Sequence, residues 1–291
     1  MKTIALFGGS FDPPHLGHYS IVHALLEIKE IDEIIVMPTY LNPFKDASFA
    51  PAELRLRWLK EIFKEERKVT VSDFEIQEEK KVPTITTAEN LSKNCDKIYL
   101  IIGADNLKDL HSWYRYSELE KLVTFMVAHR ESISIPPYYA DLQVEVNISS
   151  SEIRKKIQEE MLCRVNAKEI VQYYKKQLRT TMKERIKKIT NVLDTNKAED
   201  IEVFDLHEKN YFVEYAIIAS SLGSRHTLAL LDHLKKGIKP EETFNNVDES
   251  GDWVVIDLGD LLIHIMTAEY RAKYDMETFL SELGQSTGEE W

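Results

Sequence analysis

Short apolar runs alternate with amphipathic stretches over residues 1–178. Each run is long enough for a buried strand. The stretches between them carry apolar side chains three or four positions apart, as in helices packed on a sheet. This alternation predicts parallel strands joined by right-handed crossovers. The predicted strands are 4–7, 33–37, 69–72, 97–102, 123–128 and 142–146, and the predicted helices are 18–30, 52–65 and 84–94.

The pattern changes after residue 178. The segments predicted beyond it are helices at 180–193, at 224–236 and from 268 onward, and strands at 201–205, 212–221, 253–258 and 261–266. The charge changes at the same place, because the chain from Arg179 onward holds 13 basic and 22 acidic residues, against 24 and 27 before it. We therefore expect an α/β domain over 1–178 and a smaller α+β domain with a mixed sheet over 179–291.

Composition narrows the class of protein. The 291 residues are 43% apolar and 30% charged, which is ordinary for a globular protein, and the net charge of −12 argues against broad nucleic-acid binding. No apolar run is long enough to cross a membrane, and there is no signal-peptide pattern. The two cysteines have no partner motif and read as thiols in a reducing compartment. We expect a cytoplasmic protein without membrane or direct nucleic-acid contact.

The clearest chemistry lies in residues 8–18, Gly-Gly-Ser-Phe-Asp-Pro-Pro-His-Leu-Gly-His, which follow the first predicted strand. Gly8 and Gly9 lack a Cβ, so the backbone can turn sharply there and approach a ligand. The helix that follows points its free N–H groups and its positive dipole end at the same place. His15 and His18 lie on one face of its first turn. The combination predicts an anion site at the carboxyl end of a strand, where open α/β sheets bind nucleotides.

The strand predicted at 97–102 ends in a second group of candidate ligands. Asp105 comes two residues after Gly103 and is placed to accept hydrogen bonds from ribose hydroxyls. Trp113 follows eight residues later. It is either a flat face on which an aromatic ring can stack or a core residue.

Polar residues in two further loops have two interpretations each. Lys45, after the strand at 33–37, either reaches a triphosphate or is solvated. Thr84, Thr86 and Thr87 either cap a helix or bind a small head group through hydroxyls and backbone N–H groups.

Three consecutive serines, Ser149–Ser151, precede Arg154 at the start of another predicted helix. One serine can cap the helix. Three in a row with an arginine one turn inside suit an oxyanion, because a guanidinium can hold a phosphate through two hydrogen bonds.

These segments together resemble a nicotinate-nucleotide adenylyltransferase over about residues 1–176. Residues 8–18 resemble the nucleotidyltransferase signature Gly-Gly-Ser/Thr-Phe-Asp-Pro-x-His-x-Gly-His, and residues 148–154 resemble the family's Ile-Ser-Ser-Thr-x-Ile-Arg. Residues 101–105 with 113–116 discriminate this family from related transferases. The resemblance implies a Rossmann-like nucleotidyltransferase fold. It also implies an enzyme of NAD biosynthesis that transfers an adenylyl group from ATP to nicotinate mononucleotide and releases pyrophosphate.

The resemblance further implies a role for each matched residue. The catalytic residues would be His15, His18 and Arg154, with His18 stabilising the transition state at the α-phosphoryl group. Magnesium would be carried by ATP, since no dedicated carboxylate cage or protein metal site is visible. The residues that would bind ATP and the nicotinate nucleotide are Gly8, Gly9, Ser10, Phe11, Asp12, Lys45, Thr86, Gly103, Asp105, Trp113, Ser149, Ser150 and Ser151.

From about Thr180 to Leu283 the chain is similar to the ribosomal silencing factor family (RsfS). Residues 220–226, Ser-Ser-Leu-Gly-Ser-Arg-His, and the long segment 250–266 carry the similarity. It implies binding to a protein of the large ribosomal subunit and repression of translation. Residues 241–260 contain seven acidic residues and no lysine or arginine. This stretch is either a solvated face or a complement to a basic protein surface.

Two other functions remain open. The first domain could be a nucleotide sensor without catalysis that gates the second, although the intact His15, His18 and Arg154 argue against this. It could also be an adenylyltransferase for another phosphate ester, such as nicotinamide mononucleotide.

Overall fold

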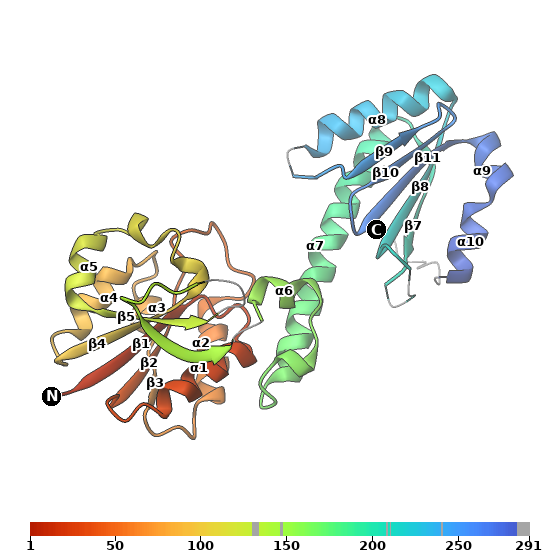
Figure 1. The fold of residues 1–291 in the computed structure, drawn as a ribbon. Coiled ribbons are helices and arrows are strands. Elements are labelled where there is room, and N and C mark those ends of the chain that lie inside the picture. Colours follow the sequence, from red (N-terminus) through yellow and green to blue (C-terminus); the bar gives the residue numbers. More distant parts are fainter. Residues whose placement is uncertain (130–133, 146–147, 208, 210, 240, 284–291) are drawn as a thin grey trace. The chain divides into compact units, whose positions relative to one another are not determined.

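The computed structural model describes the chain except for residues 130–133, 146–147, 208, 210, 240 and 284–291. The chain divides into two compact units, Met1–Leu178 and Arg179–Trp291 (Figure 1). The first contains a six-stranded parallel sheet and the second a five-stranded mixed sheet, so the predicted fold class is confirmed. Among the described residues, none of the helices combines the length and apolarity that a bilayer crossing requires.

The sheet of the first unit has the strand order β3-β2-β1-β4-β5-β6. Its strands are β1 (Thr3–Gly9), β2 (Glu33–Pro38), β3 (Val69–Val71), β4 (Lys97–Gly103), β5 (Thr124–His129) and β6 (Ala140–Glu145). The chain moves outward from β1 to β3 and then returns to the other side of β1 with β4. The direction of winding therefore reverses between β1 and β4, and ligands of open α/β sheets bind outside the carboxyl ends of strands at such a point.

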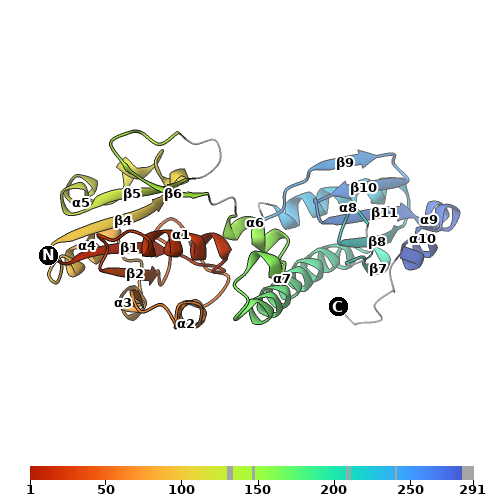
Figure 2. The ribbon, with the colours of Figure 1, turned by 60° about the horizontal axis from the view of Figure 1, so that its bottom comes forward.

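Helices cover both faces of this sheet (Figure 2). The long helices are α1 (Leu16–Leu26), α2 (Ala52–Ile62), α4 (Thr84–Leu91) and α5 (Tyr116–Leu122), and the short ones are α3 (Phe74–Gln77), α6 (Ser150–Lys155), η1 (Ala104–Asn106), η2 (Leu110–Ser112) and η3 (Glu159–Met161). Successive strand residues face opposite sides. Phe7 therefore packs in the cluster that includes α1 and α2, and Leu6 in the one that includes α4 and α5.

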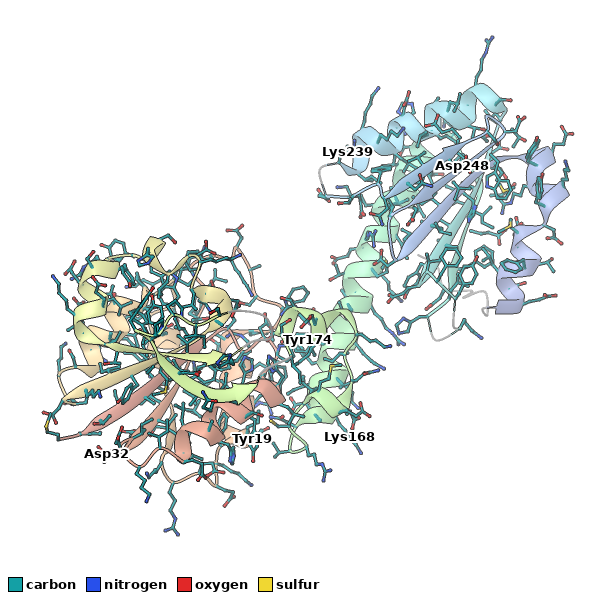
Figure 3. All side chains as sticks on the ribbon, in the orientation of Figure 1. Tyr19, Asp32, Lys168, Tyr174, Lys239 and Asp248 are labelled. Atoms are coloured by element: carbon teal, nitrogen blue, oxygen red, sulfur yellow. The ribbon has the colours of Figure 1, made fainter. Side chains whose placement is uncertain are left out.

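Helix α7 (Ala167–Thr195) is longer than the sequence pattern predicted, because it begins 13 residues before the expected start at residue 180. The early part is helical because Ile170 and Tyr174, one turn apart, are fully buried against Trp58 and α6 (Figure 3). The part after Leu178 packs in the core of the second unit through Ile186 and neighbouring apolar residues.

The second unit has the strand order β7-β8-β11-β10-β9, in which only the β8–β11 pair is parallel among the described strands. Its strands are β7 (Glu199–Asp205), β8 (Tyr215–Ser221), β9 (Asn246–Glu249), β10 (Trp253–Asp257) and β11 (Leu261–Thr267), and its further helices are α8 (Ser224–Ile238), α9 (Ala268–Tyr274) and α10 (Met276–Leu283). Helix α8 covers one face of the sheet, and α9 and α10 cover the other.

Candidate active site

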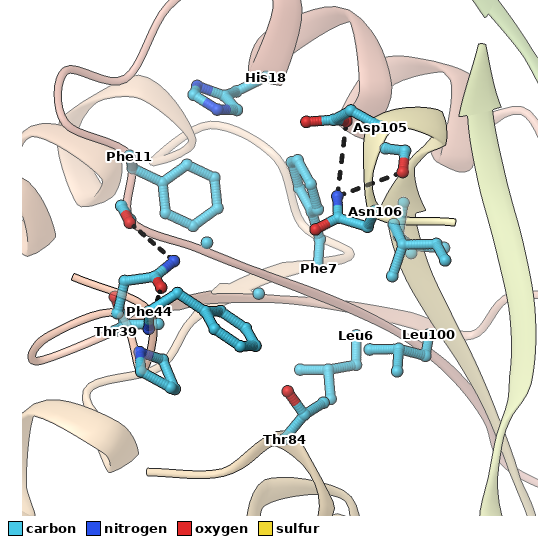
Figure 4. Close-up of a pocket in the computed structure, with 18 of the residues that line it drawn as sticks. Leu6, Phe7, Phe11, His18, Thr39, Phe44, Thr84, Leu100, Asp105 and Asn106 are labelled. Atoms are coloured by element: carbon cyan, nitrogen blue, oxygen red, sulfur yellow. Dashed lines mark hydrogen bonds between the residues drawn. The ribbon is translucent and has the colours of Figure 1, made fainter. Parts of the chain in front are cut away.

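A cavity of about 710 Å³ lies at the carboxyl ends of β1 and β4, where the winding of the sheet reverses (Figure 4). Residues from the opening loop, from the end of β4 and from the start of α6 all line it. The predicted site residues on its wall are Gly8, Gly9, Ser10, Phe11, Asp12, His15, His18, Lys45, Gly103, Asp105, Trp113, Ser149, Ser150 and Ser151. Thr86 and Arg154 do not line it. The structure therefore gathers three loops that are distant in sequence around one space.

The sharp turn of the opening loop is not at the glycines, as the sequence suggested. Gly8 and Gly9 are the last residues of β1 and pair with Met37 and Pro38 of β2. The turn comes at Phe11, whose φ of 48° is unusual for a residue with a side chain. Its ring is 1% exposed and packs edge-on at 4.8 Å from the ring of His18. Packing of this aromatic side chain, rather than glycine freedom, holds the turn and supports the imidazole.

His15 and His18 share a capping arrangement at the start of α1. The Nδ1 atom of His15 accepts a hydrogen bond from Gly17 N at 3.1 Å, and the Nδ1 atom of His18 accepts one from His15 N at 3.2 Å. The rings are stacked, with centroids 3.7 Å apart. A ring nitrogen that accepts an N–H bond carries no proton, so each neutral imidazole bears its proton on Nε2. Two N–H donors on the cavity wall suit the phosphate oxygens of a nucleotide.

The carboxylate of Asp12 is occupied by the protein itself. It accepts hydrogen bonds from Phe49 N at 2.8 Å, from Ala50 N at 3.1 Å and from the Tyr174 hydroxyl. Burial, and then the charge of Asp12, raises the pKa of Tyr174 well above its usual value, so its hydroxyl remains a donor. Three donors already hold this 3% exposed side chain, so Asp12 has a structural role, while its binding of substrate stays a prediction.

Arg55, which was not among the predicted site residues, joins the opening loop to the loop between β2 and α2. This fully buried side chain on α2 donates from Nε to Ala50 O at 3.0 Å and from Nη2 to Thr39 O at 2.8 Å and Tyr40 O at 3.0 Å; Nη1 donates to Ser10 O. Burial lowers the pKa of the guanidinium, and the charge of Asp12 opposes this. One signal was present in the sequence: Arg55 occupies a position of the apolar stripe, four residues before Leu59.

The serine-bearing segment is joined to the opening loop by side chains. Ser149 caps α6 through Glu152 N at 3.2 Å. Ser150 Oγ donates to Pro13 O at 3.0 Å. Arg154 donates to the carbonyl of Asp12 and, at 3.1 Å, to Ser151 Oγ. Arg154 therefore fastens the two loops to each other in this structure and lies just behind the cavity wall.

At the end of β4, the side chain of Asp105 lies close to the Cα atom of Gly103. A Cβ on Gly103 would lie 2.4 Å from Asp105 Oδ1, so only glycine leaves this carboxylate in place. Asn106 Nδ2 donates to Gly103 O at 3.2 Å (Figure 4). His129, at the end of β5, also lines the cavity, and its Nε2 lies 3.1 Å from Asp141 Oδ1. Asn106 and His129 were not among the predicted site residues.

The remaining wall is less polar. Trp113 lines the cavity and also packs against the core cluster, so its two interpretations are compatible. Thr84 opens α4 on the wall, whereas Thr86 is exposed outside it, and no threonine side chain caps this helix. Lys45 is exposed at the rim. Thr87 donates to Glu75, a buried carboxyl on the wall that the sequence analysis also missed.

Residues 6–156 match the family model described as cytidylyltransferase-like. Over 177 residues the chain is 54% identical to a probable nicotinate-nucleotide adenylyltransferase of Sulfurimonas denitrificans, which covers 61% of this chain and 97% of that protein. The chain belongs to the nicotinate-nucleotide adenylyltransferase family. A probable nicotinate-nucleotide adenylyltransferase of Campylobacter jejuni strain RM1221 is 44% identical over 175 residues, covering 60% of this chain and 97% of that one.

Solved structures similar to part of this chain include the nicotinic acid mononucleotide adenylyltransferase of Plasmodium falciparum complexed with NaAD. It is 21% identical, covers 60% of this chain and 96% of that one, and has a TM-score of 0.48. Residues 179–289 match the family model described as ribosomal silencing factor during starvation. The chain is therefore an adenylyltransferase-family enzyme that also carries an RsfS-family domain.

In the second domain, several acidic residues of the stretch 241–260 form ion pairs with basic residues of the same domain. Arg185 of α7 is held between Glu242 at 2.6 Å and Asp260 at 2.6 Å. Glu249 lies 3.4 Å from Lys235. Asp248, on the edge strand β9, is exposed (Figure 3). The free acidic surface is therefore smaller than the sequence suggested.

Proposed function

We propose that residues 1–178 transfer the adenylyl group of ATP to nicotinate mononucleotide, giving nicotinate adenine dinucleotide and pyrophosphate. We further propose that residues 179–291 bind a protein of the large ribosomal subunit and repress translation. The observation that carries the first proposal is the single cavity shared by the opening loop, the end of β4 and the serine-bearing segment. The second rests on the RsfS family match.

The proposed reaction needs no nucleophilic side chain. The phosphate of the mononucleotide attacks the α-phosphorus of ATP in line, so catalysis comes from positioning and from stabilising the charge on the phosphate oxygens. The Nε2–H groups of His15 and His18 would donate to those oxygens. Ser150 and Ser151 flank the same space, and Arg154 keeps their segment against the opening loop.

Magnesium belongs to this proposal as part of the substrate. Among the described residues there is no group of three or more His, Cys, Asp or Glu side chains that could hold a metal ion. Mg²⁺ is commonly bound through one or two carboxylates together with substrate phosphates. Asp105 supplies a carboxylate on the cavity wall.

Pyrophosphate release tests the first proposal. The full chain is assayed with ATP and, in turn, nicotinate mononucleotide, nicotinamide mononucleotide and phosphopantetheine. We expect the acid to be preferred. Preference for another phosphate ester would reassign the substrate, and binding of ATP without turnover of any of them would favour the sensor.

A variant of His18 tests its role. His18→Asn places an amide oxygen where Nδ1 accepts from His15 N but removes the Nε2 donor. Loss of one donor to a developing oxyanion lowers kcat by roughly 10²–10³-fold. His23→Asn, on the same helix but away from the cavity wall, is the matched control. Equal kcat values for the two variants would remove His18 from the mechanism.

The surface proposed for ribosome binding lies beside β9. Asp248 of β9 pairs in register with Val255 of β10, and Trp253 lies two residues before Val255 on β10. The side chains of Asp248 and Trp253 therefore lie on one face of the sheet. The ring of Tyr274, 46% exposed, lies 5.1 Å from that of Trp253. An exposed carboxylate next to aromatic rings suits a basic protein surface, whereas ribosomal RNA would be repelled.

Co-sedimentation with large ribosomal subunits tests this surface. Asp248→Lys should abolish co-sedimentation, because it reverses the charge at the proposed contact. Asp232→Lys, on an exposed position of α8, is the control of equal charge change. Binding by both variants at the wild-type level would place the contact elsewhere.

A further inference from the structure

Glu75 is a buried carboxyl on the wall of the adenylyltransferase cavity that the proposed mechanism does not use. It lies on the short helix α3, it is 5% exposed, and it lines the cavity. The Thr87 hydroxyl donates to its Oε1 atom at 2.6 Å. Its other oxygen, Oε2, accepts no hydrogen bond from any described residue.

Oε2 is nevertheless not sealed inside the protein. The buried side-chain atoms without a partner among the described residues belong to His23, Thr39, Trp58 and Asn166, and Oε2 of Glu75 is not one of them. Because the Glu75 side chain lines the cavity, we infer that this oxygen is reached from the cavity. Because the Thr87 hydroxyl already points its proton at Oε1, a proton bound to this carboxyl lies on Oε2, where a ligand in the cavity can accept it.

Burial makes this carboxyl protonate near neutral pH. It raises the pKa of Glu75 to about 7, and the Thr87 hydrogen bond opposes the rise. The titratable side chains on the elements around it are Glu33 on β2 and Glu89 on α4, and those across the cavity are His15, His18, Lys45, Asp105 and His129. None of their charges is among the causes of the shift.

The neighbours of Glu75 indicate which part of a ligand it meets. Val82 and Pro83 directly precede α4, whose Thr87 binds Glu75, and the indole of Trp113 lines the same cavity. These apolar surfaces suit an aromatic head group. Thr84, beside them, lies across the pocket from His18, where the phosphates are proposed to bind (Figure 4). A pyridine ring carrying a small polar substituent therefore fits here.

We propose that Glu75 selects between acid and amide substrates through the proton on Oε2. Protonated Glu75 donates to the carboxylate of a nicotinate nucleotide, whereas ionised Glu75 repels that carboxylate and accepts from the amide N–H of a nicotinamide nucleotide. This inference rests on the proposed adenylyl transfer to a pyridine mononucleotide. It makes Glu75 a specificity-determining residue whose preference depends on pH.

The experiment compares kcat/KM for nicotinate and nicotinamide mononucleotides between pH 6 and pH 9, using the full chain. The ratio of the two values cancels pH effects that both substrates share, such as titration of their phosphates. In the wild-type enzyme the acid-to-amide ratio should fall by about tenfold per pH unit above the pKa of Glu75. Glu75→Gln keeps an uncharged donor at every pH, so its ratio should stay flat and acid-selective.

Glu78→Gln, an exposed carboxyl three residues along the chain, is the control and should keep the wild-type profile. A wild-type ratio that does not change with pH would overturn the inference, and this measurement needs no variant to fold. An unchanged pH profile in Glu75→Gln would overturn it as well. If the wild-type enzyme turned over neither mononucleotide at any pH, the proposed function itself would fail, which is a distinguishable result.

Discussion

The hydroxyl of Tyr174 should stabilise the first unit without taking part in catalysis. It is one of three donors to the buried carboxylate of Asp12, and the other two are backbone N–H groups of Phe49 and Ala50. Tyr174→Phe removes only this donor and leaves the packing of the ring against Trp58. A hydrogen bond to a charged group is worth about 1.5–3 kcal/mol.

This loss converts into a measurable shift of the unfolding temperature. For a unit the size of Met1–Leu178, each kcal/mol lowers Tm by about 2–4 °C, so Tyr174→Phe should lower it by roughly 3–12 °C. Tyr173→Phe is the matched control, because the Tyr173 hydroxyl donates at 3.3 Å to the carbonyl of Phe49 and not to a buried charge. Calorimetry of the full chain gives Tm, and hydrogen exchange of peptides from residues 1–178 assigns the transition.

Kinetics decides between a structural and a ligand-binding Asp12. We expect Tyr174→Phe to keep the wild-type KM for ATP at temperatures below its transition. If Tyr174→Phe had the same Tm as Tyr173→Phe but a raised KM for ATP, the structural assignment of Asp12 would be refuted.

Two further predictions concern the end of β4 and the second unit. Gly103→Ala should raise KM for ATP, because the new Cβ would lie 2.4 Å from Asp105 Oδ1 and displace that carboxylate; an unchanged KM would show that Asp105 does not contact the nucleotide. Burial lowers the pKa of His264 to about 4, so the folded unit resists protonation that the unfolded chain accepts below about 6.5. The free energy of unfolding of this unit should have its full value above pH 6.5. It should fall by up to about 1.4 kcal/mol per pH unit as the pH drops towards 4. His264→Asn keeps an acceptor for Trp253 Nε1 and should remove this slope in urea titrations at pH 7 and pH 5, whereas an unchanged slope would assign it to other groups.

The sequence predicted the parallel sheet and the position of the candidate site residues at the ends of its strands, because both depend on local patterns. Buried strands and amphipathic helices leave periodic signals, and the carboxyl ends of parallel strands meet at one edge, so residues 8–18 and Gly103 could be expected near each other. The structure confirms the parallel sheet and brings the three expected loops to one cavity.

What the sequence could not give depends on contacts between distant residues. A carboxylate in the opening motif looks like a ligand until Tyr174, 162 residues away, is seen to donate to it. Arg55 looks like a solvated helix residue until the opening loop and the loop between β2 and α2 are found to place carbonyls around it. Glu75, which was not among the predicted site residues, is buried because folding brings it against Thr87. The turn at Phe11 was also missed, because turn propensity alone places it at the neighbouring glycines.

The convergence of three loops on one triphosphate is tested most directly by the structure of the full chain with a non-hydrolysable ATP analogue. We predict that the phosphates lie within hydrogen-bonding distance of the Nε2 atoms of His15 and His18, beside Ser150, with the ribose next to Asp105. A nucleotide bound with its phosphates away from these imidazoles, or outside this cavity, would contradict the account.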